Sequence, residues 1–163
     1  DTVALVMLWV LFLLIEASDL ADGAIARRLE QTSDTGKLLD PFADSLSRLT
    51  YFFCFTIADL MPIWIFLVLL YRDLGVGFIR LLVLRRGITL SARLSGKLKA
   101  WVYAIAGIMG LLKMTIVGAV PDSLAATIVG PTATVVFYLA GVVAVWSLVD
   151  YGMVLIRPRS EES

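Results

Sequence analysis

The segment DLADGAIAR, residues 19–27, and the segment GKLLDPFAD, residues 36–44, are separated by eight residues and together decide the fold. Apolar residues flank them from Val3 to Ile15 and from Leu46 to Ile57. A carboxylate near a bilayer core costs roughly 2.5 kcal/mol or more, so acids in such a setting mark a functional site with a partner. The simplest partner for four clustered acids is one or two divalent cations.

The composition predicts a helical membrane protein. The 163 residues are 60% hydrophobic and have a mean hydropathy of +0.89, whereas soluble domains are about 45–50% apolar. We therefore expect one transmembrane domain over residues 1–163. The formal net charge is zero, and no nucleic-acid partner is expected. Because the sequence contains no histidine, zinc sites built on histidine and histidine general bases are excluded.

Five apolar segments have the length that a bilayer requires, about 20 residues each. We predict an all-α, polytopic membrane helix bundle with five spans joined by short loops. The predicted spans are Val3–Arg28, Lys37–Ala58, Pro62–Leu84, Lys97–Val117 and Thr132–Ile156. The loop Asp59–Met61 is short enough for a tight helical hairpin, and the segment Gly118–Gly130, with Pro121 inside it, is predicted to be a loop.

Basic residues predict the orientation, since they are enriched in cytoplasmic loops. They gather around the first and third predicted loops and after the last span, which all fall on one side of a five-span bundle. The opposite side carries Asp1, Asp59 and Asp122. We therefore expect the chain in the cell inner membrane, with its acidic site open to the cytoplasm.

The four aspartates have the spacing of a metal site. Asp19 and Asp22 are three residues apart and Asp40 and Asp44 are four apart, so each pair shares a helix face. If the two helices are antiparallel neighbours, the pairs converge into a cup of four carboxylates. Hard oxygen ligands suit Mg²⁺, Mn²⁺ or Ca²⁺. A role as interfacial salt bridges would not require glycines at fixed offsets or four acids on two consistent faces.

Residues beside the cup suit a phosphate ligand. Gly23 and Gly36 carry no side chain, so a phosphate or nucleotide can approach the backbone there. Arg27 follows Gly23 by one helical turn and offers a bidentate fork to a phosphate. Carboxylate-bound metal ions beside an arginine are an arrangement for phosphoryl transfer.

The complete string, D-x2-D-G-x2-A-R-x8-G-x3-D-x3-D, resembles the motif of the CDP-alcohol phosphotransferase family at every fixed position. The resemblance implies a homodimeric membrane enzyme of six spans that uses two metal ions, Mg²⁺ or Mn²⁺. Such enzymes transfer a phosphatidyl or similar group from a CDP-linked donor to an alcohol and release CMP. Because this sequence shows five spans, we expect an earlier span to be missing from it.

The resemblance also implies roles for individual residues. Asp19, Asp22 and Asp40 are implied metal ligands, and Asp44 is the implied general base, which also lies near the second metal. The implied lining of the CDP pocket is Gly23, Ala26, Arg27 and Gly36.

The third span and the loop after it are similar to phosphatidylglycerophosphate synthases within the family. Arg72-Asp73 is followed by Arg80, and the loop carries Ser91-x-x-x-Ser95-Gly96-Lys97-x-Lys99. The expected substrates are CDP-diacylglycerol and glycerol 3-phosphate or a similar polar alcohol, in contact with membrane lipids. Ser45, Ala100 and Glu16 depart from the synthase pattern. Inositol phosphate and phosphatidylglycerol therefore stay open as alternative acceptors.

Four cations are candidates for binding the phosphate of the acceptor: Arg72, Arg80, Lys97 and Lys99. Arg80 lies nearer the cytoplasm and is the favoured residue. Arg72 is deeper, and its candidate partners are Asp73, Glu16 and an acid of the cup. Glu16 either extends the polar cavity or neutralises an arginine.

A different class of function is a membrane cation transporter that uses the four acids as its translocation site. It requires a path of acids to the far side. Past their cytoplasmic ends, the fourth and fifth spans offer only Lys113 and Asp150 as ionisable residues, which disfavours transport.

Overall fold

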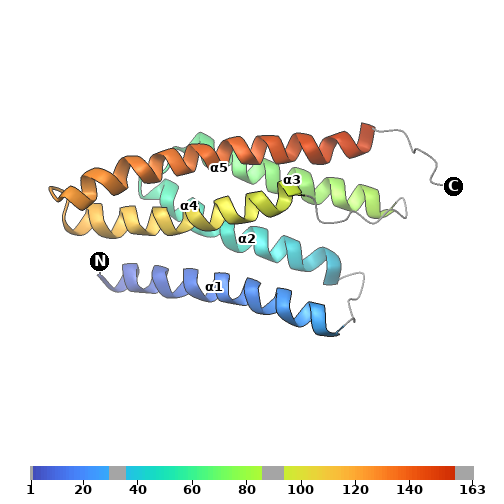
Figure 1. Cartoon of the computed structure of the whole chain (residues 1–163), viewed down its shortest axis with the longest axis horizontal. Coiled ribbons are helices and arrows are strands. Elements are labelled where there is room, and N and C mark those ends of the chain that lie inside the picture. Colours follow the sequence, from blue (N-terminus) through green and yellow to red (C-terminus); the bar gives the residue numbers. More distant parts are fainter. Residues whose placement is uncertain (1, 30–35, 86–93, 157–163) are drawn as a thin grey trace.

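The computed structural model is an all-α bundle (Figure 1). It describes the backbone of residues 2–29, 36–85 and 94–156, and the side chains in these ranges except those of residues 2, 4, 19–29, 36–41, 84 and 154–156. The helices are α1 (Thr2–Leu29), α2 (Gly36–Ile57), α3 (Ile63–Arg85), α4 (Leu94–Ala119) and α5 (Leu124–Ile156). No strand occurs in these ranges, so the predicted all-α fold class is confirmed. The first predicted loop, Glu30–Thr35, lies outside the described residues, and so do residues 87–93 of the third predicted loop, Gly87–Gly96. That loop prediction is wrong for residues 94–96, because α4 begins at Leu94.

A tight turn joins α2 to α3, as the short Asp59–Met61 segment predicts. Asp59 has a φ of 55°, a left-handed conformation that aspartate tolerates better than most residues. The backbone N–H of Leu60 donates to the carbonyl of Phe55 at 2.9 Å, which closes the end of α2. Pro62 directly precedes α3, where its missing N–H leaves no hydrogen bond unmade. The result is an antiparallel helical hairpin.

The prediction of a loop over Gly118–Gly130 is wrong, because α4 continues to Ala119 and α5 already begins at Leu124. Ser123 caps α5, since its Oγ accepts a hydrogen bond from the backbone N–H of Ala126 at 3.1 Å. Pro131 lies inside the helix and removes one backbone donor there. The helix nevertheless continues through Pro131, because α5 has 33 residues and is mostly apolar.

The described helices share a main hydrophobic core, and a smaller apolar cluster lies between α3 and α5. α5 packs along α4 and α3, while α1 packs against α2 and α4. Fully buried aromatic rings fill the centre, and Phe52 contacts Tyr103 with ring centroids 5.4 Å apart. Gly107 and Gly110 of α4 lie against this aromatic core, because an added Cβ would come within 2.5 Å of Phe12 and 2.4 Å of Phe55, respectively. These glycines allow close helix packing, as their place in an apolar span suggests.

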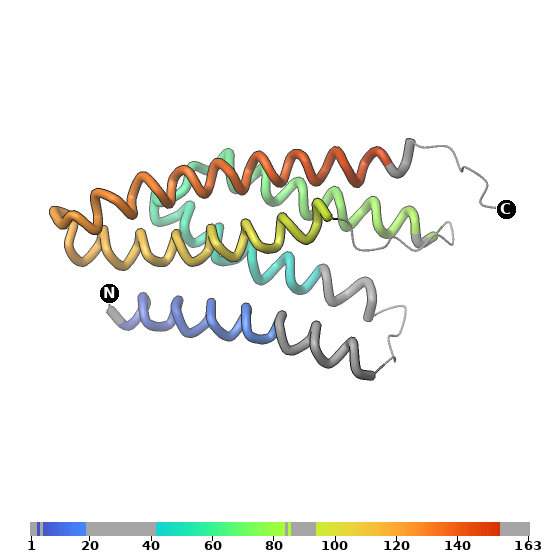
Figure 2. The backbone as a smooth tube through the Cα atoms, in the orientation of Figure 1, coloured from blue at the N-terminus to red at the C-terminus, as the bar shows by residue number. Residues whose placement is uncertain are grey.

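The topology brings three chain regions to one end of the bundle (Figure 1). The end of α1 with the start of α2, the end of α3 with the start of α4, and the end of α5 all lie there, whereas the turns α2–α3 and α4–α5 lie at the other end (Figure 2). The predicted antiparallel order of helices is therefore confirmed for the described residues.

Two of the described helices are long and apolar enough to cross a membrane: α4, and α5 as far as Met153. Large apolar side chains also cover the outer surface, and those of α1 are at least half exposed at Val6, Val10 and Leu14. Contiguous apolar surface of this kind marks contact with lipid or with another protein. Together these features indicate a membrane protein, while the five-span arrangement stays a prediction.

We expect Gly110→Ala to lower the unfolding temperature of the purified protein. The new methyl group would displace Phe55, which is fully buried and packs against Phe137, and overpacking of a core costs about 1–3 kcal/mol. The matched control is Gly118→Ala on the same helix, where nothing lies within 4 Å of the added Cβ. Thermal unfolding in detergent measures both, and equal stability of the two variants would contradict this packing.

Candidate active site

The α1–α2 hairpin carries the acid string. At 1.5 Å per residue, Asp22 and Asp19 lie about 10 and 15 Å back from the end of α1, and Asp40 and Asp44 lie about 6 and 12 Å into α2. Because α1 packs against α2 and the two helices run antiparallel (Figure 1), all four positions fall at the same end and at similar depth. The backbone thus places the four positions at comparable depth, and the convergence of their carboxylates into a cup stays a prediction.

Only one of the four carboxyl groups, that of Asp44, belongs to a described side chain. It is half-buried and has an interaction partner. The side chains of the other predicted donor-site and metal-site residues lie outside the described residues: Asp19, Asp22, Gly23, Ala26, Arg27, Gly36 and Asp40. The described side chains include no group of three or more metal-ligating residues. The chemistry of the donor set, all carboxylate oxygen, fits a hard divalent cation.

Glu16 of α1 pairs with Arg48 of α2. The Arg48 Nε lies 3.8 Å from the Glu16 Oε1, and the side chains are 12% and 22% exposed. Glu16 precedes Asp19 by three residues and Arg48 follows Asp44 by four, so this ion pair joins the two helices about one turn deeper than the acid string. Of the two alternatives for Glu16, the structure supports neutralisation of an arginine.

A buried ionic triad links α3, α4 and α5. Asp73 accepts a hydrogen bond from Arg72 Nη1 at 2.8 Å and another from Lys99 Nζ at 3.0 Å. Arg72 Nη2 donates to the Ser147 hydroxyl of α5 at 2.6 Å. Arg72, Asp73 and Lys99 are 5–7% exposed. Of the three predicted partners for Arg72, the structure selects Asp73.

A second set of contacts lies nearer the end of α3. Arg80 donates from Nη2 to the Tyr151 hydroxyl at 3.1 Å, and its Cζ lies 5.4 Å from the centre of the Tyr151 ring. Ser95 of α4 donates to an Asp150 carboxylate oxygen at 2.5 Å. Lys97, by contrast, is exposed. The structure therefore brings Arg72, Arg80 and Lys99 together and leaves Lys97 at the surface.

We refer to the residues joined by these contacts as the three-helix polar cluster: Arg72, Asp73, Arg80, Ser95, Lys99, Ser147, Asp150 and Tyr151. Its three cations and two carboxylates leave one positive charge. Within the described part of the chain, Arg72 Nε and the Tyr103 hydroxyl are buried without a hydrogen-bond partner. A buried net positive charge with unused donors favours an anionic ligand.

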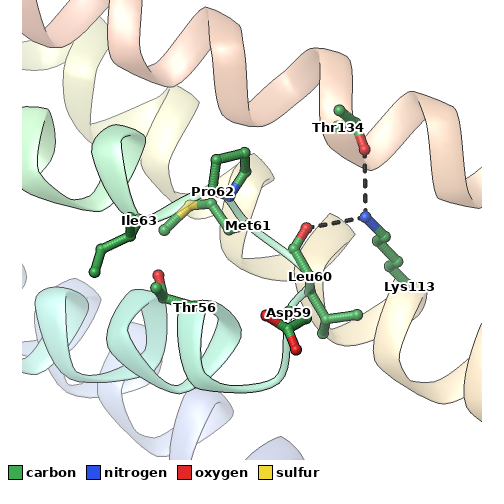
Figure 3. A pocket seen from close by; sticks show the side chains of 8 residues that line it. All are labelled: Thr56, Asp59, Leu60, Met61, Pro62, Ile63, Lys113 and Thr134. Carbon is green, nitrogen blue, oxygen red and sulfur yellow. Dashed lines mark hydrogen bonds between the residues drawn. The ribbon is translucent and has the colours of Figure 1, made fainter.

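The opposite end of the bundle contains a cavity of about 450 Å³ beside the α2–α3 turn (Figure 3). Lys113 of α4 reaches toward it and donates to the Leu60 carbonyl at 2.9 Å and to Thr134 at 3.3 Å. Asp59 is the acidic residue among those that line the cavity. These contacts of Lys113 hold the α2–α3 turn against α4 and α5, so a structural role explains why a lysine lies here.

Some residues of the cluster were not predicted as site residues. Ser147 and Tyr151 lie in the most apolar helix, more than 65 residues from their partners on α3. The available signal was their spacing, since Ser147, Asp150 and Tyr151 at i, i+3 and i+4 share one helix face. Arg48 has a similar signal, because it follows Asp44 by one turn.

A family model described as CDP-alcohol phosphatidyltransferase matches residues 1–146. A relative from Treponema pallidum (strain Nichols), named CDP-diacylglycerol–glycerol-3-phosphate 3-phosphatidyltransferase, is 39% identical over 102 residues, which are 63% of this chain and 47% of the relative.

Two further relatives have other names. A probable phosphatidylglycerophosphate synthase from Mycobacterium tuberculosis (strain CDC 1551 / Oshkosh) is 32% identical over 139 residues, 85% of this chain and 64% of the relative. A cardiolipin synthase (CMP-forming) from Streptomyces coelicolor (strain ATCC BAA-471 / A3(2) / M145) is 46% identical over 56 residues, 34% of this chain and 26% of the relative. The chain thus spans about half to two thirds of the synthases that it matches over most of its length.

We expect Asp73→Asn to destabilise the folded protein by about 3 kcal/mol or more, because it leaves two buried cations without a counter-charge. Asp122→Asn is the control, since Asp122 is exposed in the α4–α5 turn. Thermal unfolding in detergent measures both variants. An Asp73→Asn protein as stable as the control would show that the triad does not hold the three helices together.

Proposed function

Because the chain belongs to the CDP-alcohol phosphatidyltransferase family, we propose that it transfers a phosphatidyl group from CDP-diacylglycerol to glycerol 3-phosphate and releases CMP. The observation that carries this proposal is the complete acid string on two packed, antiparallel helices. The names of the Treponema and Mycobacterium relatives support the choice of reaction.

In this proposal the donor and the acceptor are bound by separate residues. Asp19, Asp22, Asp40 and Asp44 would hold two ions, Mg²⁺ or Mn²⁺. When bound, such ions neutralise the charge of the donor pyrophosphate and polarise the phosphorus. Gly23, Ala26 and Gly36 leave room for the CDP group, and Arg27 binds a donor phosphate through its two-pronged guanidinium.

Asp44 is the proposed general base. It takes the proton from the acceptor hydroxyl as the hydroxyl oxygen forms a bond to the β-phosphorus of CDP-diacylglycerol. The bond from that phosphorus to the bridging oxygen breaks, and CMP leaves with the bond electrons. Asp44 is half-buried, which suits a base that must reach a substrate hydroxyl and yet be shielded from bulk water.

Arg80 is the proposed ligand of the acceptor phosphate. Within the described ranges it has no carboxylate partner and one neutral partner, the Tyr151 hydroxyl. Arg72 and Lys99 are instead bound to Asp73. We propose that they assist binding of the acceptor phosphate through the net positive charge of the triad. Lys97 is exposed and would meet the phosphate at the mouth of the site.

Other acceptors use the same chemistry. Inositol phosphate also carries a phosphate, whereas phosphatidylglycerol presents its hydroxyl on a lipid, and a CMP-forming cardiolipin synthase is among the relatives. A charged, buried cluster favours a phosphorylated soluble alcohol over a second lipid. Offering labelled CDP-diacylglycerol with each acceptor and separating the lipid products decides among them.

Cation transport finds little support among the described residues. Lys113 ties the α2–α3 turn to α5, and Asp150 accepts from Ser95 at the end that also carries the acid string. No continuous line of acids connects the two ends in the described ranges. CMP release from CDP-diacylglycerol is the discriminating observation, because a transporter would not catalyse it.

The proposed setting is the cell inner membrane, with the acid string and the three-helix polar cluster at the cytoplasmic end. The acyl chains of the donor would lie among membrane lipids beside the apolar helices. A homodimer stays a prediction from the family resemblance.

Asp40→Asn and Asp44→Asn should each reduce turnover to a few per cent or less, because each removes a carboxylate charge or the base while it keeps the side-chain shape. The matched control is Asp59→Asn at the opposite end of the bundle, which should retain full turnover. CMP release and size-exclusion profiles are measured together. Substantial activity in either site variant would contradict the assignment.

Chelation should abolish turnover, and added Mg²⁺ or Mn²⁺ should restore it, since the carboxylate donor set prefers hard cations. The measurement is CMP release in excess EDTA, with metal content determined on the same sample. Full activity in a preparation that holds no metal would rule out metal assistance.

Arg80→Ala should lower catalytic efficiency about 10- to 150-fold, mainly by raising the KM for glycerol 3-phosphate. A charge-assisted hydrogen bond is worth roughly 1.5–3 kcal/mol, and each 1.4 kcal/mol is about tenfold. Arg85→Ala is the control, because Arg85 is exposed on the same helix. Steady-state kinetics with each substrate varied in turn measure the effect. Weakened donor binding with an intact acceptor KM would assign Arg80 to the donor.

A further inference from the structure

Tyr151 of α5 lies against residues of two other helices. Its hydroxyl accepts a hydrogen bond from Arg80 Nη2 at 3.1 Å, and its ring centre lies 5.4 Å from Arg80 Cζ and 5.8 Å from Arg72 Cζ. The side chain is 1% exposed and packs with Val76, Ile79 and Val83 of α3. One buried phenol therefore contacts two arginines of α3, Arg72 and Arg80.

These contacts restrict the guanidinium of Arg80. An arginine side chain has many rotamers, and ordering it costs free energy whenever it binds a ligand. A ring beneath the guanidinium and a hydrogen bond to one nitrogen select one arrangement in advance. Nη2 is held by the phenol, and no other contact of the described residues engages the remaining nitrogens of Arg80. They can therefore meet an anion.

Gly96 of α4 lies directly beside the hydroxyl of Tyr151. A Cβ built at Gly96 would lie 2.9 Å from the Tyr151 hydroxyl oxygen but 3.7 and 3.8 Å from the nearest ring carbons. Only the hydroxyl is too close, since the ring distances are ordinary van der Waals contacts. The absence of a side chain at position 96 is thus what allows the hydroxyl of Tyr151 to occupy its place.

We propose that Tyr151 is a positioning residue that holds the Arg80 guanidinium for the phosphate of the acceptor, and that Gly96 provides the space for its hydroxyl. The proposal rests on the proposed function, in which Arg80 binds that phosphate. It adds a role for α5 and for the start of α4.

The competing explanation is that Tyr151 only fills the core between α3 and α5. Loss of packing alone lowers the unfolding temperature or the yield of folded protein, and it affects both substrates alike. Loss of positioning raises the acceptor KM and leaves the donor KM unchanged. The two explanations therefore separate in the kinetics.

The test uses Tyr151→Phe, Gly96→Ala and the double variant. Tyr151→Phe keeps the ring and removes the hydroxyl, so we expect the acceptor KM to rise about 2- to 12-fold, which corresponds to the cost of ordering one long side chain on binding. Gly96→Ala should raise it similarly by displacing the hydroxyl. In the double variant the close contact no longer exists, so its KM should equal that of Tyr151→Phe alone instead of the product of the two effects.

Two controls match these changes. Tyr138→Phe removes the hydroxyl of an exposed tyrosine on the same helix, and Gly118→Ala adds a Cβ to α4 where nothing lies within 4 Å. Both should leave the two KM values unchanged. A multiplicative double variant, or an unchanged acceptor KM in Tyr151→Phe, would overturn the proposal.

A binding measurement separates this proposal from the proposed function. Isothermal titration calorimetry of the purified protein with glycerol 3-phosphate reports binding without turnover. If the unaltered protein binds glycerol 3-phosphate but releases no CMP, the proposed reaction fails while weaker binding by Tyr151→Phe still supports positioning. If Tyr151→Phe binds as tightly as the unaltered protein, or if the unaltered protein does not bind, positioning is refuted.

Discussion

The arrangement of α3, α4 and α5 depends on one interaction, the pairing of the Asp73 carboxylate with both Arg72 and Lys99. A charge removed from water costs several kcal/mol unless it is paired and hydrogen-bonded. Asp73 pairs with two cations at once, and the Ser147 hydroxyl of the third helix accepts a further hydrogen bond from Arg72. The triad thereby fixes the rotation of each helix, and that rotation brings Arg80 of α3 to Tyr151 of α5.

The same constraint divides the bundle into two chemical halves. The α1–α2 hairpin carries the acids, and α3, α4 and α5 carry the cluster with one excess positive charge. Aromatic rings of α2 and α4 lie between them, and Lys99 Nζ sits 4.3 Å from the ring centre of Tyr103, which in turn packs on Phe52. In the proposed reaction the acidic half serves the metal-bound donor and the cationic half serves the acceptor, so the two substrates meet where the halves adjoin.

Much of this arrangement could be predicted from the sequence. The apolar lengths give the number of helices, and the spacing of Asp19, Asp22, Asp40 and Asp44 places them on two helix faces near one loop. The start of α5 was missed because Pro131 suggested a break, whereas the cap at Ser123 and the long apolar run that follows decide the outcome. The partners of Glu16 and Arg72 could not be chosen, because the sequence does not give the rotation of one helix against another and so does not show which opposite charge each side chain meets. Tyr151 was missed because its spacing from Ser147 and Asp150 indicates a shared helix face but does not show that this face meets Arg80 of α3.

The central claim, transfer of a phosphatidyl group from CDP-diacylglycerol to glycerol 3-phosphate, is tested most directly by the products of one reaction. Purified protein is incubated with Mg²⁺, labelled CDP-diacylglycerol and glycerol 3-phosphate, and CMP and the lipid products are quantified together. The account predicts CMP and phosphatidylglycerophosphate in equal amounts, with neither formed when the acceptor is omitted. Folded, metal-supplied protein that releases no CMP, or that forms a different lipid in preference, would contradict it.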